Sequence, residues 1–307
     1  MQEEERRQLL ETLAATPGRL KAALQGIPKK LLLWRPAPGK WSILEIVCHL
    51  RDMEREAYLA RYRRILAEDD PRLPDVDGDV LALTRDYRSQ KLPAVLKDWR
   101  AARKESLRLL KGVKGPAWQR VGTHESAGRL SMEDFLRRHA VGNDEAHLGQ
   151  IEATKRRFAI LERLAGTPKA LAAAVKGLGA EAARRRPAGG KWSILENACH
   201  LRDIEFVYAE RFTKLAFQAE RPTFWMMDND RGAAELCYNE QDLSATAKEF
   251  AARRADTLAL LRALPHALWQ RTGTHPKRGE LTLEGLAEFL AQHDESHIGR
   301  IRALREA

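Results

Sequence analysis

The sequence predicts an all-α protein made of two tandem four-helix bundles. Three observations support this fold class: the 307-residue chain repeats one block of sequence, each copy has four stretches with apolar residues at helical spacing, and neither copy shows a series of alternating strand patterns. Four amphipathic helices of one copy can bury their apolar faces against one another, as in a bundle.

The repeat has the length of a domain. The segment KWSILEIVCHLRDME at 40–54 recurs as KWSILENACHLRDIE at 191–205, and 12 of the 15 positions are identical. The same offset of 151 residues relates the later motifs WQRVGTH and WQRTGTH. Solenoid repeats are far shorter. We therefore expect one domain over 1–153 and a second over 154–307.

The first helix of each copy is expected at about 3–15 and 154–166. A Thr-Pro pair follows each stretch, and a proline inside a helix removes a backbone hydrogen bond. Both first helices are therefore expected to be short. No glycine or proline interrupts 151–164, so the last helix of copy one is expected to continue into the first helix of copy two.

The second helix of each copy begins at a Trp-Ser-Ile-Leu-Glu motif. Ser42 with Glu45, and Ser193 with Glu196, have the spacing of a capping box, in which each side chain binds a free backbone N–H of the first turn. Glu196 also lies one turn before His200. The sequence leaves open whether this glutamate caps the helix or orients the histidine.

The third helix is expected over about 93–111 and 243–264, and the fourth begins after Ser131 or Thr282. A long connection that contains proline separates the second helix from the third in each copy, and its length permits a crossover. The WQRxGTH motif predicts a loop or short hairpin directly before the fourth helix.

Other residues of the repeat have structural interpretations. Trp41 and Trp192 are expected to pack in the core, and Cys48 and Cys199 are expected to be small buried side chains rather than ligands or nucleophiles. The apolar cluster at 224–227 replaces LPDV of copy one. It either lines a substrate pocket beside the histidines of copy two or covers the core.

Composition excludes several classes of protein. Lysine and arginine number 53 against 43 acidic residues, a net charge of +10 that both halves share evenly, so no basic arm for nucleic acid is present. No apolar run approaches the roughly 20 residues that span a bilayer. Three cysteines do not form a disulfide framework, and the acidic N-terminus has no apolar signal core. We expect a cytoplasmic protein that binds neither membrane nor nucleic acid.

Three histidines of copy two have the spacing of a metal site. His293 and His297 are four residues apart, which places both on one face of a helix. His200, on the second helix, is the candidate for a third ligand. Three imidazoles leave a coordination position for water or substrate, as in catalytic zinc sites. Zinc and nickel are the divalent metals that we expect.

Copy one retains only part of this pattern. His49 and His147 correspond to two of the histidines, but Asn143 replaces the third, and a neutral amide is a poor ligand for zinc-like ions. His139 lies about 12 Å along a helix from His147, too far to share an ion. One residue is inserted here relative to copy two, and a helical bulge is expected to absorb it. Copy one is therefore expected to bind metal weakly or not at all.

These motifs resemble the DinB-like (YfiT-like) superfamily. The resemblance rests on K-W-S-x-x-E-x-x-x-H in both copies and on H-x-x-x-H-x-G-x-I in copy two, and it covers nearly all of the chain. It implies two up-down-down-up bundles related by a pseudo-two-fold axis, similar to a family dimer fused into one chain. It also implies a divalent metal bound by His200, His293 and His297. Relatives that are transferases or isomerases use low-molecular-weight thiols.

The sequence therefore predicts a metal-dependent enzyme with one site, in copy two, that acts on a small-molecule substrate. The expected reaction is either a thiol-dependent S-transfer or a related hydrolysis. The alternative is a non-catalytic duplicated module that serves as a scaffold or binding surface, with a structural metal or none. The two copies are expected to form an internal pseudo-dimer in a monomeric chain.

Overall fold

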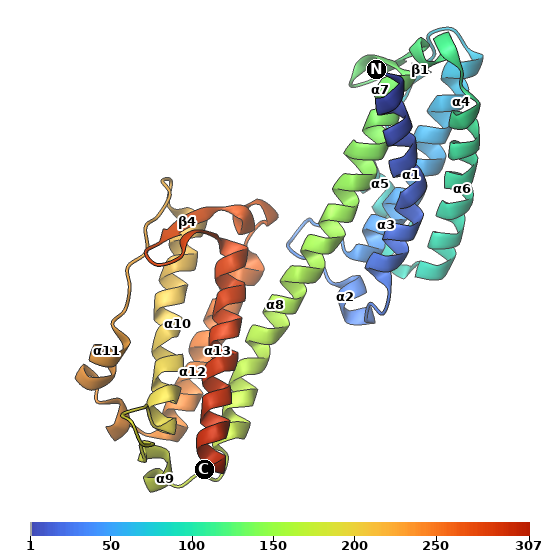
Figure 1. The fold of residues 1–307 in the computed structure, drawn as a ribbon. Coiled ribbons are helices and arrows are strands. Elements are labelled where there is room, and N and C mark those ends of the chain that lie inside the picture. The colour runs from blue at the N-terminus through green and yellow to red at the C-terminus, as the bar shows by residue number, and fades with distance from the viewer. Residues whose placement is uncertain (1) are drawn as a thin grey trace. The chain divides into compact units, whose positions relative to one another are not determined.

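The computed structural model describes residues 2–307 and contains two tandem helical units (Figure 1). The first unit comprises the chain up to Arg35 and Lys40–Lys155, and the second comprises Arg156–Ala307 with Pro36–Gly39. The division after Lys155 lies two residues beyond the boundary expected from the repeat. Within residues 2–307, no helix has both the length and the apolarity needed to cross a membrane.

The bundle of the first unit has four long helical segments, two of which change helix type along their length. In chain order they are α1 (Glu3–Leu24); α3 (Ile43–Asp52) with η1 (Met53–Tyr58) and α4 (Leu59–Ala67); α6 (Leu92–Gly112); and α7 (Met132–Arg137) with η4 (Arg138–Glu145) and the first part of α8 (Ala146–Val175). The connections contain α2 (Lys29–Leu33), α5 (Gly78–Thr84), η2 (Tyr87–Ser89) and η3 (Gly115–Gln119).

The second unit repeats this order with uninterrupted helices. Its bundle consists of the last part of α8, α10 (Ile194–Phe217), α12 (Leu243–Ala263) and α13 (Leu283–Glu306), and its connections contain α9 (Ala180–Arg184), α11 (Asn229–Glu235), η5 (Tyr238–Glu240) and η6 (His266–Gln270). α8 is one helix of 30 residues, which confirms that the last helix of copy one continues into copy two. The predicted all-α fold class is confirmed.

Each WQRxGTH motif leads into a β-hairpin, one of the two structures that the sequence left open. β2 (Val121–His124) pairs with β3 (Gly128–Ser131), and β4 (Thr272–His275) pairs with β5 (Gly279–Thr282), both antiparallel. In the first unit β1 (Arg72–Leu73) joins β2 in parallel. The hairpins bring the chain directly to the start of the fourth helix.

The second and third helices of the second unit run in the same direction. Near the start of α10, Cys199 lies 3.7 Å from Gln241, which precedes α12, and further along both helices Glu205 pairs with Arg254. Residue numbers therefore rise together along α10 and α12. Two parallel consecutive helices need a crossover connection, and the segment that contains α11 provides it (Figure 1).

The first and fourth helices of this unit are also parallel to each other. Arg156, where the second unit's part of α8 begins, pairs with Glu284 at the start of α13, and Arg163 pairs with Glu295 further along both helices (both 2.8 Å). Together with the parallel second and third helices, this arrangement is the up-down-down-up topology that the resemblance implied.

Both first helices continue through their Thr-Pro pair, so the expectation that they end before it is wrong. α1 contains Pro17, and a proline leaves the carbonyl four residues earlier without its helical N–H partner. That carbonyl belongs to Leu13, and Nη1 of Arg103 donates a hydrogen bond to its oxygen (3.1 Å). The corresponding residues of the second unit are Pro168, Leu164 and Arg254 (3.1 Å).

These arginines belong to buried ion clusters that the sequence analysis did not predict. Arg103 contacts Glu54 (2.6 Å) and Asp144 (2.7 Å), and all three side chains are almost fully buried. The corresponding cluster of the second unit contains Arg254, Glu205 and Asp294. Buried charges are tolerated when they are paired and hydrogen-bonded, so each cluster ties three helices of its bundle together.

Two π-helical segments absorb extra residues in the first unit. η4 lies where the sequence predicts a bulge, and that prediction is confirmed. η1, in the second helix, was not predicted. After η1, Arg61 takes the place of Arg211, since each donates a hydrogen bond to a backbone carbonyl of the connection that follows its helix (2.8 Å in both). The offset between these two arginines is 150 residues instead of 151, which shows that the first unit has one extra residue in η1. α10 has no such segment.

Candidate metal centre

His200, His293 and His297 come together in the second unit from two neighbouring helices. α10 starts at a formed capping box, in which the Ser193 side chain accepts from the Glu196 N–H and the Glu196 side chain accepts from the Ser193 N–H. α13 carries the other two histidines on one face, as their four-residue spacing requires. His200 and His297 are buried and His293 is half-buried.

The three imidazoles lie at the separations that one shared ion requires. One nitrogen from each ring lies within 4.8 Å of those of the other two, and Nε2 of His200 is 3.0 Å from Nε2 of His293. Two nitrogens that bind one ion at about 2.0–2.1 Å are roughly 3–3.4 Å apart. The donor set therefore fits a single transition-metal ion.

Asn197 orients one of these rings, and the sequence analysis missed it. Nδ1–H of His297 donates to Oδ1 of Asn197 (2.8 Å), and the Asn197 amide nitrogen donates to the carbonyl of Ser193 (2.8 Å). The second bond fixes which end of the amide faces the histidine. Since Nδ1 carries the proton, Nε2 of His297 keeps its lone pair for a ligand.

Electrostatics keep these rings in the form that binds metal. Burial lowers the pKa of His200 from 6.5 to about 3 and that of His297 to about 2, and the neighbouring His293 adds to both shifts. The two imidazoles are therefore neutral at pH 7. Neutral imidazole is the form that binds metal ions.

Trp192 packs against a cluster of buried core residues, as expected, and its ring also lies against the histidines. It is half-buried, and its ring centroid is 5.1 Å from that of His200. Its Nε1–H donates to Asp230 of α11 (3.1 Å). The tryptophan thus covers one side of His200 and links the histidine site to the crossover connection.

The first unit brings only two histidines together. The ring centroids of His49 and His147 are 4.7 Å apart, and Asn143, at the third position, is buried. His139 points elsewhere, with Nε2 at 2.8 Å from Glu54 in the buried ion cluster. Burial lowers the pKa of His49 to about 3, so this ring is also neutral at pH 7, but the third imidazole is missing.

In the first unit, the connection between the second and third helices, which contains α5, packs closely over His49. A Cβ atom at Gly78, the first residue of α5, would lie 2.7 Å from Nδ1 of His49 and 2.9 Å from the Trp41 ring. The second unit has Asn229 at the corresponding position. Its side chain excludes the same close approach to His200.

The other candidate residues have structural roles. Glu196 caps α10 and pairs with Arg186, so of the two roles left open the structure supports capping. Cys48 and Cys199 are fully buried, as expected. Burial raises the pKa of the Cys48 thiol to about 12 and that of Cys199 to about 11, which leaves neither as a thiolate at neutral pH.

Of the two roles left open for the cluster at 224–227, the structure supports cover of the core for Phe224. Phe224 is buried in the core, whereas Trp225 and Met227 line a cavity between α10, α12 and the crossover connection. None of the three histidines lines this cavity. Phe224 therefore covers the core, whereas Trp225 and Met227 line a cavity that is separate from the histidine site.

Comparisons with known proteins identify the family. No curated protein matches the chain. Among solved structures, YfiT from Bacillus subtilis, described as a probable metal-dependent hydrolase with an unusual four-helix bundle topology, is 19% identical, with a TM-score of 0.49 over 52% of this chain and 90% of that chain. The family model of the DinB superfamily matches residues 12–151 and again 163–301. The chain therefore belongs to the DinB superfamily and contains two tandem domains of it.

Proposed function

We propose that the second unit binds one divalent transition-metal ion through His200, His293 and His297, and that the protein is a metal-dependent enzyme. The observation that carries this proposal is the convergence of three imidazole nitrogens from two helices within 4.8 Å. Three imidazoles are a ligand set that suits zinc and nickel.

The chain's own residues prepare the site for such an ion. Asn197 holds the tautomer of His297, and Trp192 shields one side of His200. The buried carboxylate of Asp294, which pairs with Arg254, lies 3.6 Å from Nδ1 of His293. When bound, a divalent ion lowers the pKa of a coordinated water or thiol and so supplies a nucleophile near neutral pH.

The reaction that we propose is transfer of a low-molecular-weight thiol to a small electrophile, or hydrolysis of a small ester or amide. Both reactions need a nucleophile activated near neutral pH, and neither needs a side-chain nucleophile. The buried cysteines next to His49 and His200 are too poorly ionised to provide one. We assign the activity to the second unit alone.

The proposal is tested by the metal content of the purified full chain. We expect about one zinc or nickel ion per chain, and loss of nearly all of it in His297→Ala. The matched control is His147→Ala, which removes the corresponding histidine of the first unit and is expected to leave the metal content unchanged. Equal loss in both variants, or no metal after incubation with either ion, would contradict the proposal.

Activity assays separate an enzyme from a scaffold. The metal-loaded chain is tested with glutathione or cysteine and 1-chloro-2,4-dinitrobenzene, and with p-nitrophenyl esters. We expect turnover in one of these assays, abolished by a chelator and by His297→Ala. Stoichiometric metal without turnover of any of these substrates would favour the non-catalytic scaffold instead.

A further inference from the structure

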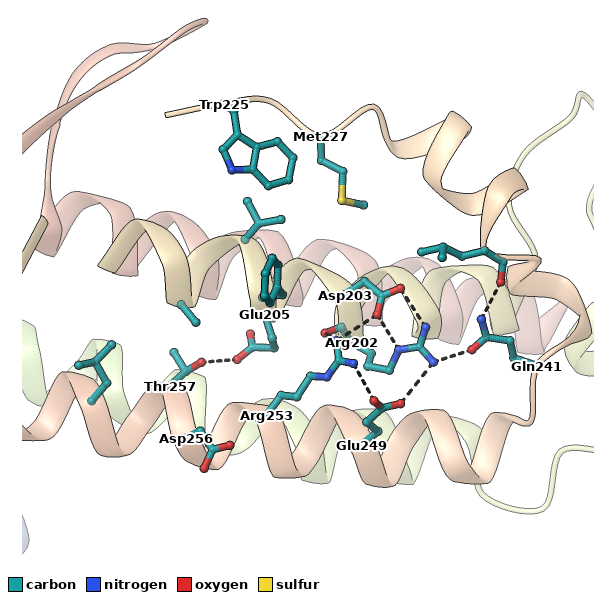
Figure 2. A pocket seen from close by; sticks show the side chains of 15 residues that line it. Arg202, Asp203, Glu205, Trp225, Met227, Gln241, Glu249, Arg253, Asp256 and Thr257 are labelled. Atoms are coloured by element: carbon teal, nitrogen blue, oxygen red, sulfur yellow. Dashed lines mark hydrogen bonds and ion pairs between the residues drawn. The ribbon is translucent and has the colours of Figure 1, made fainter. Parts of the chain in front are cut away.

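The second unit contains a cavity that the histidine site does not use. Its volume is about 860 Å³, and it lies between α10, α12 and the crossover connection. Figure 2 shows Trp225 and Met227 of the connection on one side, and Glu249, Arg253 and Asp256 of α12 on the other. Cavities of this size suit small molecules.

The first unit has an ion-pair bridge at the corresponding place. There Arg85 of the connection reaches across to Asp52 (3.1 Å) and Glu56 (2.5 Å) of the second helix. The second unit has Leu236 at the position of Arg85, so this bridge is absent from it. The equivalent Asp203 pairs with the adjacent Arg202 and with Arg253, which comes from α12 instead of from the connection.

Large apolar side chains at the cavity of the second unit are exposed to solvent. Phe206, Trp225 and Leu236 line it and are 67%, 43% and 53% exposed. A cluster of exposed apolar side chains beside a cavity is typical of a binding site. This wall therefore suits the apolar body of a ligand.

The charged side chains of the cavity disfavour a negatively charged ligand. Arg202 and Arg253 donate to Asp203, Glu249 and Gln241, so their guanidinium groups are engaged by partners within the protein (Figure 2). An anion would have to break these bonds.

Asp256 supplies a free negative charge. Among residues 2–307, Asp256 makes no ion pair, whereas the equivalent Glu105 of the first unit pairs with Arg63. Glu205, the remaining acidic side chain of the lining, pairs with Arg254, which also pairs with Asp294. The lining residues therefore include four carboxylates and two arginines, which is an excess of negative charge.

We propose that this cavity is a second ligand site, which binds a small organic cation with an aromatic or aliphatic body. The exposed Trp225 ring attracts cations through its π face, and the unpaired Asp256 carboxylate adds charge complementarity. The proposal does not depend on the metal, because no histidine lines the cavity.

The test is calorimetric titration of the full chain with benzyltrimethylammonium, in the presence of a chelator that keeps the histidine site free of metal. We expect saturable binding of one cation per chain. Phenylmethanesulfonate, an anion of similar shape, is expected not to bind. Absence of saturable cation binding, or equal binding of the anion, would overturn the proposal.

Variants locate the binding. Leu236→Arg restores the bridging residue of the first unit and is expected to abolish binding, and Asp256→Asn is expected to weaken it about threefold. Glu105→Gln, the equivalent change in the first unit, is the control and should leave affinity unchanged. Thermal melts show whether each variant folds. If Leu236→Arg does not fold, the affinity of Asp256→Asn for the cation is the deciding measurement, and an unchanged affinity would contradict the proposal. Unchanged affinity in a folded Leu236→Arg would place the bound cation elsewhere and contradict the assignment.

Discussion

Asn197 acts on the histidine site through a single hydrogen bond. Its Oδ1 accepts from Nδ1–H of His297 and so directs Nε2 of that ring towards the other two imidazoles. The first unit has Ile46 at this position, which cannot accept a hydrogen bond. The two units thus differ at the position of the candidate ligand His293 and at the position of Asn197, which orients the ligand His297.

Replacement of Asn197 by the residue of the first unit tests this role. Asn197→Ile is expected to weaken metal binding about 10–100-fold, the usual effect of losing such a partner. Competition with a chromophoric chelator measures the affinity. Asn197→Asp keeps an acceptor and should bind nearly as tightly as the natural chain, and Ile46→Asn in the first unit should change nothing. Unchanged affinity in Asn197→Ile would show that the hydrogen bond is not needed.

The three cysteines are expected to differ sharply in reactivity. Cys48 and Cys199 are buried and their pKa values are raised to about 12 and 11, whereas Cys237 is exposed. At pH 8 we expect a disulfide reagent such as Ellman's reagent to modify one thiol per native chain and three in urea. Cys237→Ser should abolish the native reaction. Rapid modification of two or three native thiols would contradict the burial of the other pair.

The three histidines of the candidate site were predictable from helical spacing and from the repeated motif that contains His200. His293 and His297 share a face because they are four residues apart, whatever surrounds them. The role of Asn197 depends on how α10 packs against α13, which spacing does not encode. The available signal was a polar residue at a position that is apolar in the other copy.

At the scale of helices, the buried arginine clusters explain how a proline fits inside each first helix. Arg254 donates to the carbonyl that Pro168 leaves unpaired and also pairs with Glu205 and Asp294. One side chain therefore joins α12 to the three other helices of its bundle. The helix ends predicted from the Thr-Pro pairs were wrong because this partner is distant in the sequence.

Two neighbouring arginines provide a stability test. Arg254→Met is expected to reduce the free energy of unfolding by about 3–5 kcal/mol, because it leaves two buried carboxylates without a cation. Arg253→Ala breaks only partly exposed pairs and should cost less than about 1 kcal/mol. Urea denaturation followed by circular dichroism measures both. Equal costs would contradict a special role for the buried cluster.

At the scale of the whole chain, the two units share a fold but differ at their functional positions. Both have a capping box on the second helix and a buried ion cluster. In the part of the chain that the structure describes, residues 2–307, three converging histidines occur in the second unit alone, and Leu236 replaces the bridging arginine there. The repeat made the tandem bundles predictable, because apolar spacing and capping motifs occur twice. The cavity was not predictable, since it depends on which distant side chains form ion pairs.

The most direct test of the central claim is anomalous diffraction from crystals of the full chain, collected above and below the absorption edge of the bound metal. We expect one strong anomalous peak per chain, contacted by His200, His293 and His297, and no peak beside His49 and His147. Crystals soaked in zinc or nickel that show no peak among the three histidines, or an equal peak in the first unit, would contradict the assignment.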